Sequence, residues 1–232
     1  MNEALSHSTS LPQRLYEGFE RIASVMRGEQ WSASSAQGLN PAQLQVLRLL
    51  AARENRELRV KAIAAHMGVS APAVTDTLAA LERKGLVAKS ADLADTRAVL
   101  VNITPQGRSV LDAIKLVPSD TDVALAQLSA SEQADLLLLQ IKLIRLLQNA
   151  GTIPVQRMCI TCLHFRPNVY VNALKPHHCA FVNLAFGDRD LRLDCGEHET
   201  AESSVQTATW RNFTQNGSES LQAQPKTEGS LS

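Results

Sequence analysis

Residues 60–104, VKAIAAHMGVSAPAVTDTLAALERKGLVAKSADLADTRAVLVNIT, decide the fold of this chain. Val60–Met67 has apolar residues at helical spacing, and Gly68 follows at a position where glycine ends helices. Ser70 stands where its hydroxyl can cap a second helix, which runs to about Lys84 with apolar residues at every third or fourth position. The stretch therefore predicts two short helices joined by a tight turn.

The period of the sequence changes after Gly85. Leu86–Val87 and Val99–Ile103 are short and rich in β-branched residues, so they predict two strands. The polar residues 90–98 between them predict a loop. Two angled helices followed by a hairpin make a winged helix-turn-helix, which is mainly α with a small β wing.

An ordered series of motifs in and around this stretch resembles the MarR family of bacterial transcription regulators. The motifs are Leu39–Gln43 leading into Val46 and Leu47, the two helices above, Asp95-Thr96-Arg97 in the wing, and Ile103–Gly107. The similarity spans about Leu11 to Gly151. It implies a winged-helix DNA-binding and dimerisation domain over residues 11–151, with flanking dimerisation helices. It also implies a homodimeric regulator, a repressor or an activator, that binds double-stranded DNA at a palindromic operator.

The helix that begins at Ser70 is expected to read the major groove through small and hydroxyl side chains. The resemblance implies that Arg97 enters the minor groove and that Asp95 helps to hold it. The candidate DNA-contacting residues are Ser70, Ala71, Pro72, Thr75, Thr77, Lys84, Lys89, Asp95 and Arg97. The alternatives are a solvated helix face and, for Asp95 and Arg97, a surface ion pair.

The charge of the chain gives the DNA prediction little support. The net charge is zero, and residues 53–97 carry eight Lys or Arg against six Asp or Glu. Non-specific DNA affinity comes from neutralised phosphates, so the family resemblance carries this prediction rather than electrostatics.

Two segments outside the reading helices predict helices with one apolar face each. The first is residues 11–28, before a small-residue loop predicted for Ser32–Gly38. The second begins at a capping box, Ser129–Glu132, and is rich in Leu. We expect these faces to pack against a second copy, with packing inside the chain as the alternative. The family commonly uses a pocket for a small organic effector between its helices, and this sequence leaves room for one.

The chain lacks an apolar run long enough to span a bilayer, and its first ten residues lack the apolar centre of a signal peptide. We therefore expect a cytoplasmic protein without a membrane partner. In that compartment disulfides are not expected, and clustered cysteines indicate metal binding or redox chemistry. We find no nucleophile–base pair, phosphate loop or open metal site, so an enzyme is not expected.

Residues 155–199 hold all four cysteines of the chain and predict a metal-binding module. Cys159 and Cys162 form a C-x2-C pair, and Cys179 and Cys195 follow singly. A close pair followed by two isolated cysteines resembles high-potential iron–sulfur proteins. We favour a four-iron, four-sulfur cluster as the cofactor, with Zn²⁺ as the alternative. The predicted apolar shell is Ile160, Leu163, Phe165, Phe181, Phe186 and Leu193. His164, His177, His178 and His198 could replace a cysteine or donate to a sulfur, and the alternative is ordinary polar surface.

The two ends of the chain predict no fold. Residues 1–10 predict a flexible N-terminus, and residues 200–232, rich in Ser, Thr, Gln, Glu and Gly, predict a disordered tail.

The sequence thus predicts a MarR-like regulator modulated by a cysteine-ligated centre, with iron–sulfur redox sensing favoured. One alternative is a regulator with a structural zinc site and an organic effector. Another is an electron-transfer or metal-handling protein with a vestigial winged helix.

Overall fold

A computed structural model describes residues 9–53, 57–92 and 95–220, with the side chains of 96–97 and 216–220 left out. The chain divides into two compact units, Met1–Leu128 and Ser129–Ser232. The first contains the winged helix and the second contains the four cysteines.

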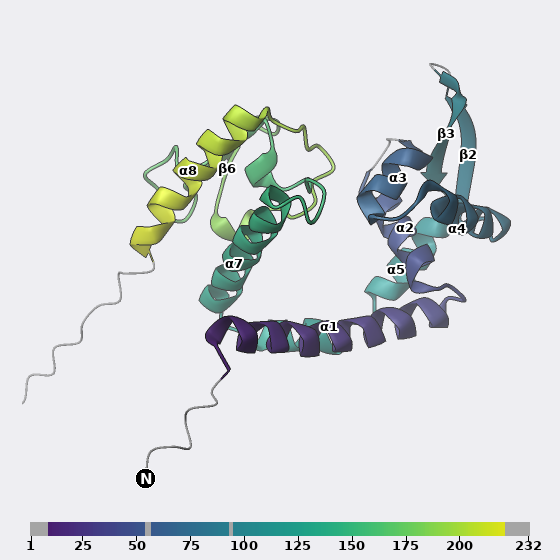
Figure 1. The fold of residues 1–232 in the computed structure, drawn as a ribbon, viewed down its shortest axis with the longest axis horizontal. Helices are drawn as coiled ribbons and strands as arrows, with labels where there is room; N and C mark the ends of the chain where they lie inside the picture. The colour runs from purple at the N-terminus through teal and green to yellow at the C-terminus, as the bar shows by residue number, and fades with distance from the viewer. Residues whose placement is uncertain (1–8, 54–56, 93–94, 221–232) are drawn as a thin grey trace, which may run out of the picture. The chain divides into compact units, whose positions relative to one another are not determined.

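The helix-turn-helix of the first unit has the boundaries that the sequence predicts (Figure 1). Helix α2 is Pro41–Ala51, α3 is Val60–Met67 and α4 is Ala71–Arg83. Gly68 ends α3 with φ 65°, a left-handed conformation that favours glycine. Ser70 Oγ accepts from the amide of Ala73 at 3.4 Å, so the predicted cap of α4 is present.

The wing is a three-stranded antiparallel sheet in the order β1-β3-β2. The strands are β1 (Leu58–Arg59), β2 (Val87–Asp92) and β3 (Asp95–Ile103). The prediction of a polar loop over residues 90–98 was largely wrong. Strand pairing reaches into this segment, with Ala91 opposite Val99 and Asp92 opposite Asp95, because polar side chains can stay solvated while the backbone pairs.

The core of the first unit lies between the helix-turn-helix and the base of the wing. Its fully buried side chains come from α2, α3, α4 and β3; they include Leu44, Leu47, Ile63, Val74, Leu78, Leu81 and Val101. Helix α5, Pro105–Lys115, closes this core through Leu111. The apolar spacing read from the sequence is therefore the buried face of each helix.

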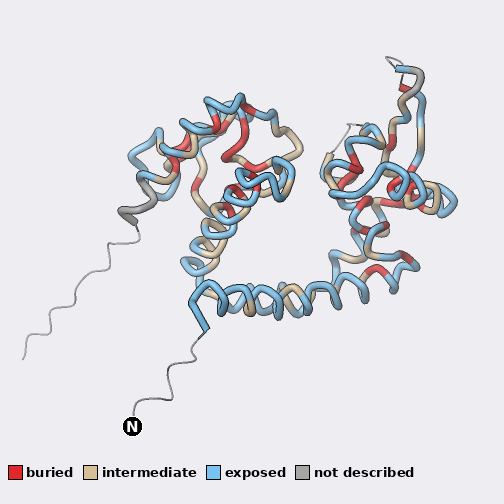
Figure 2. Tube along the Cα trace, viewed as in Figure 1, coloured by how far each residue is buried: buried red, intermediate tan, exposed pale blue. Residues whose placement is uncertain are grey.

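Helix α1 runs from Leu11 to Ala36, well past the predicted end at residue 28. The predicted loop at Ser32–Gly38 is therefore helical for most of its length, and the chain turns at Gly38, with φ 64°. The hydroxyl of Ser34 donates to Trp31 O at 3.0 Å, which lets a buried serine stay in a helix. The apolar face of α1 is largely exposed along its length (Figure 2).

Helix α6, Asp120–Gln127, was not predicted from the sequence. Ser119 and Asp122 form a capping box at its start. The amide and hydroxyl of Thr121 both donate to Glu29 Oε1 of α1, at 2.7 and 2.9 Å, so α6 is fixed to α1.

The second unit begins with helix α7, Ala130–Asn149, whose predicted capping box between Ser129 and Glu132 is present. The cysteine segment follows, with the three-stranded antiparallel sheet β4-β5-β6 and two short 3-10 helices. The elements are η1 (Cys159–Thr161), β4 (Phe165–Arg166), β5 (His177–Cys179), β6 (Leu184–Phe186) and η2 (Asp188–Asp190). Sequence similarity suggested a domain ending at residue 151, whereas α7 belongs to the cysteine unit because Ile141 packs into its core.

Helix α8, Ser203–Ser220, lies where the sequence predicts a disordered tail. Phe213 is 5 % exposed and Gln206 is 7 % exposed. Phe213 packs against Phe165 and Trp210, with ring centroids 6.0 and 6.1 Å apart. Apolar packing of one helical face thus outweighs the polar composition of this segment. None of the helices in the described ranges is long and apolar enough to cross a membrane.

Candidate nucleic-acid interface and cysteine site

The start of α4 presents a small, polar, exposed surface. Ser70, Ala71, Pro72 and Thr75 are all exposed, and Thr77 is half-buried. Thr75 and Thr77 donate their hydroxyl protons to Ala71 O and Ala73 O, each at 2.9 Å. Their oxygens can still accept, so this end of α4 can meet donors and apolar groups on base edges.

The two lysines predicted to contact phosphate make internal hydrogen bonds. Lys84 Nζ donates to Gly38 O at 2.6 Å and to Gln43 Oε1 at 2.9 Å. Lys89 Nζ lies 2.7 Å from Glu82 Oε2. A phosphate contact by either ammonium would therefore share or replace these bonds.

The turn end of the β2–β3 hairpin, where Asp92 pairs with Asp95, contains an ion-pair group that the sequence did not reveal. Arg59, on β1, donates from Nε to Asp92 Oδ2 at 2.8 Å, and its Nη1 lies 3.7 Å from Asp95 Oδ2. Asp95, predicted to hold Arg97, is thus also beside Arg59. The Arg97 side chain lies outside the described part of the structure. Arg59 and Asp92 are 33 positions apart in the sequence, so no local signal of this pairing exists.

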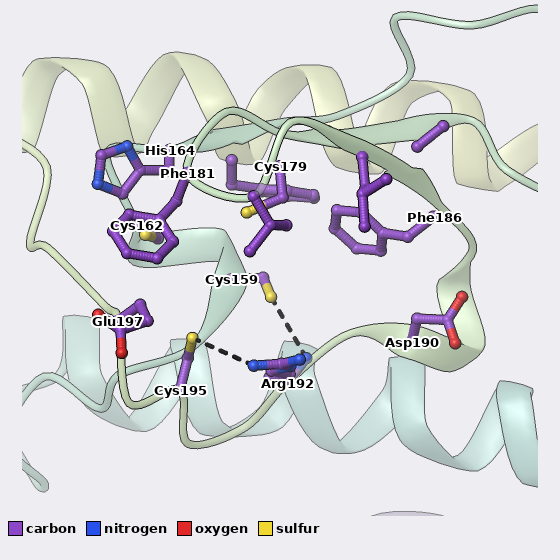
Figure 3. A pocket seen from close by; sticks show the side chains of 14 residues that line it. Cys159, Cys162, His164, Cys179, Phe181, Phe186, Asp190, Arg192, Cys195 and Glu197 are labelled. Atoms are coloured by element: carbon purple, nitrogen blue, oxygen red, sulfur yellow. Dashed lines mark hydrogen bonds between the residues drawn. The ribbon is translucent and has the colours of Figure 1, made fainter. Parts of the chain in front are cut away.

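All four cysteines line one cavity of about 200 Å³ in the second unit (Figure 3). Cys159 comes from η1, Cys162 follows it, Cys179 ends β5, and Cys195 lies in the loop after η2. Phe165, Phe181 and Phe186 line the same cavity, as expected of the predicted shell. Ile160 and Leu193 lie in the core instead, and Leu163 is exposed.

The four cysteines line the cavity without forming a site for a single metal ion in the described part of the chain. Four thiolates around one zinc, each at about 2.3 Å, would lie about 3.8 Å apart. Among the described residues, no three His, Cys, Asp or Glu side chains gather closely enough to hold one ion. A space of about 200 Å³, the liquid volume of about seven waters, suits a larger group. Four cysteines around such a space fit the ligand set of an iron–sulfur cluster.

The four nearby histidines each have a partner other than sulfur. The Asn168 amide donates to His177 Nδ1 at 3.2 Å, and His177 Nε2 donates to Asp188 at 2.8 Å, so both ring nitrogens are used. The partners of His164, His178 and His198 are Glu199 (3.2 Å), Tyr170 (2.9 Å) and Thr161 (2.9 Å), respectively. Burial, followed by the charge of Arg157, lowers the pKa of His198.

The protein's own contacts hold the first and last cysteines together. The Cys159 amide donates to Arg192 O at 3.1 Å, and the Cys195 amide donates to Arg157 O at 3.0 Å. Arg157 also contacts Asp194 Oδ1 at 2.6 Å. Burial raises the pKa of the Cys159 thiol to about 11, while the hydrogen bond from the Arg192 amide acts in the opposite direction. The metal-free thiol is thus protonated at neutral pH, and a bound metal would displace that proton.

The comparisons with known proteins concern the winged helix. The sequence model of the MarR family matches residues 39–99. The S. aureus MepR–DNA complex is 24% identical, covers 58% of this chain and 98% of its own, and has a TM-score of 0.51. Sco5413, a MarR family transcriptional regulator from Streptomyces coelicolor, is 26% identical, covers 62% and 97%, and has a TM-score of 0.49. No curated protein matches the chain.

The match to the family model ends before the first cysteine, so the cysteine site lies outside it. Within the match lie α2, α3, α4 and the start of the wing, in the order that the sequence predicted. The MepR structure has a similar fold. Residues 39–99 are therefore similar in sequence to the MarR family, and their fold is a winged helix-turn-helix.

Proposed function

We propose that this chain is a homodimeric, DNA-binding transcriptional regulator whose operator affinity depends on a cysteine-ligated iron–sulfur centre. The observation that carries the DNA-binding part is the exposed start of α4 within the segment that the MarR family model matches. MepR, whose structure was solved in complex with DNA, has a similar fold.

The iron–sulfur part of the proposal rests on the shared cavity of the four cysteines. The packing of this site also suggests how it communicates with the rest of the chain. Cys159 and Cys162 belong to the same core as Ile141 of α7. A centre that orders the cysteine loops would therefore stabilise one face of α7, and its loss or oxidation would loosen that face.

The dimer part of the proposal rests on exposed apolar faces in both units. On α1, Leu15, Phe19 and Ile22 are each about half exposed. On α7, Leu139 and Leu146 are similarly exposed, on a helix whose Ile141 is buried. Exposing several large apolar side chains on one helix face to water is unfavourable, and such faces suit contact with a second copy of the chain.

DNA binding is tested by fluorescence anisotropy with fragments from the chain's own upstream region, over a range of salt concentrations. We expect Arg97→Ala to weaken binding and to reduce the salt slope by about 1. Lys115→Ala, which removes the same charge at the end of α5, is the control and should bind as the unchanged protein does. Binding without salt dependence, or equal losses in both variants, would refute the proposed interface.

The centre is tested by absorption spectroscopy with iron and acid-labile sulfide analysis on protein purified without oxygen. We expect iron and sulfide in comparable amounts, and loss of both in Cys162→Ser. Operator affinity should then differ between the loaded and metal-free dimers. Equal operator affinity for Cys→Ser variants and unchanged protein, under all redox conditions, would refute sensing.

A second candidate function keeps the winged helix but assigns regulation to an organic effector. A cavity of about 920 Å³ lies in the first unit, lined by α1, α5, the start of α6 and Arg48 of α2. Its lining combines apolar side chains such as Val25 and Ile114 with charges of both signs, so it suits a small organic molecule with polar groups. A colourless protein with one zinc per chain, together with operator release by small organic compounds, would favour this alternative.

A further inference from the structure

One residue at the cysteine cavity, Arg192, contacts two of the four sulfurs (Figure 3). Its backbone amide donates to Cys159 Sγ at 3.3 Å, and its Nη1 donates to Cys195 Sγ at 3.8 Å. The two cysteines stand 36 positions apart in the sequence, so a single residue joins the first and last members of the set.

The backbone of Arg192 is held from both sides. Leu191, directly before it, is 5 % exposed and packs in the core of the second unit. Arg192 O also accepts from the Cys159 amide at 3.1 Å, which makes the contact between these two residues reciprocal. After it, Asp194 is paired with Arg157. The amide is thus fixed against sulfur, while the guanidinium reaches its sulfur from an exposed side chain.

The charge around the cavity makes Arg192 distinctive. Among the fourteen residues that line it, all within the described ranges, Arg192 is the only Lys or Arg. Two carboxylates, Asp190 and Glu197, line the same cavity. Asp190 Oδ2 accepts from the Gly187 amide at 3.0 Å. Four cysteine sulfurs and two carboxylates therefore line the cavity together with one guanidinium.

We propose that Arg192 is a positioning residue that raises the reduction potential of the centre held by the cysteines. Hydrogen bonds to ligand sulfurs and a nearby positive charge both stabilise the state that carries one more electron. Arg192 supplies both, to two ligands at once. This inference rests on the proposed iron–sulfur centre and adds which residue sets its redox response.

The test compares variants by redox titration followed by absorbance, after iron and sulfide have been measured in each. Arg192→Met removes the guanidinium and keeps the backbone amide, and Arg192→Lys keeps a positive charge. Arg189→Met is the matched control, because Arg189 is exposed, lies three residues earlier and does not line the cavity. If the Arg192→Met protein does not retain iron, the Arg192→Gln protein replaces it, and its redox titration is compared with that of Arg192→Lys.

We expect Arg192→Met to lower the reduced-to-oxidised ratio at a fixed solution potential by tenfold or more, equal to 59 mV for one electron. Arg192→Lys should keep most of the original ratio, and Arg189→Met should change it less than threefold. Equal changes in Arg192→Met and Arg189→Met, or none in Arg192→Met, would overturn this inference alone. Unchanged protein lacking iron and sulfide would overturn the proposed centre and this inference together.

Discussion

Replacing Phe213 by Ala tests the packing of α8, the helix that the sequence did not predict. The Phe213 ring is 5 % exposed and lies 5.7 Å from the His177 ring and 6.0 Å from the Phe165 ring, between centroids. A phenylalanine buries about 150 Å² or more, which at about 25 cal/mol/Å² corresponds to about 4 kcal/mol. This agrees with the cost of about 3–5 kcal/mol typical of Phe→Ala substitutions in cores.

The assay uses tryptophan fluorescence during urea unfolding. The chain has two tryptophans, so Trp31→Phe leaves Trp210, on α8, as the reporter of the second unit. With an m value of about 1–2 kcal/mol/M, Phe213→Ala should lower the urea midpoint of this unit by about 2 M or more.

Arg211→Ala, on the exposed face of the same helix, serves as the control and should shift the midpoint by less than about 0.5 M. A midpoint for Phe213→Ala equal to that of the control would mean that α8 does not pack on the cysteine unit. The reasoning that apolar burial outweighs the polar composition of this segment would then be refuted.

Three further predictions concern the helices and the pH response. Gly107→Ala should lower the free energy of unfolding by about 1–3 kcal/mol, since the new Cβ would lie 2.3 Å from Leu86 O. Gly18→Ala has open space around it and should raise the free energy of unfolding by about 0.8 kcal/mol. Thermal unfolding of both variants compares the two effects. Ser129→Ala should cost the second unit about 1 kcal/mol in urea unfolding by removing a capping box, and no loss would contradict the capping geometry. Burial lowers the pKa of His198 in the folded chain, so the unfolded chain binds a proton there at a higher pH than the folded chain does. The stability of the second unit should therefore fall as the pH drops below about 6.5. His198→Gln should flatten that fall between pH 7.5 and 5.5, and an unchanged slope would exclude His198 as its source.

The winged helix was predictable because its signals are local. The glycine after α3 and the serine before α4 each act on their own helix ends, and apolar spacing alone marks the buried faces. The wing strands were predicted too short because polar residues also take part in strand pairing. Lys89 pairs with Val101 and Asp95 pairs with Asp92 through their backbones, and side-chain polarity does not reveal such pairing.

The cysteine site was predicted only as a set of residues. Spacing suggested that the four sulfurs meet, and they line one cavity. The partners of the histidines and the role of Arg192 depend on contacts between distant loops, which leave no periodic signal. Helix α8 did leave a signal, since Gln206, Trp210 and Phe213 follow helical spacing, but the composition of the segment concealed it.

The junction between the two units has a consequence for how such a chain can be assembled. Helix α6 ends at Gln127, Leu128 is extended, and Ser129 caps α7 through a capping box made from its own first turn. Nothing before Ser129 is needed to start α7. A flexible linker inserted at this peptide bond would leave both helix ends intact. The cysteine unit could therefore be transferred as a whole by gene fusion. It could be attached to another DNA-binding domain or removed from this one.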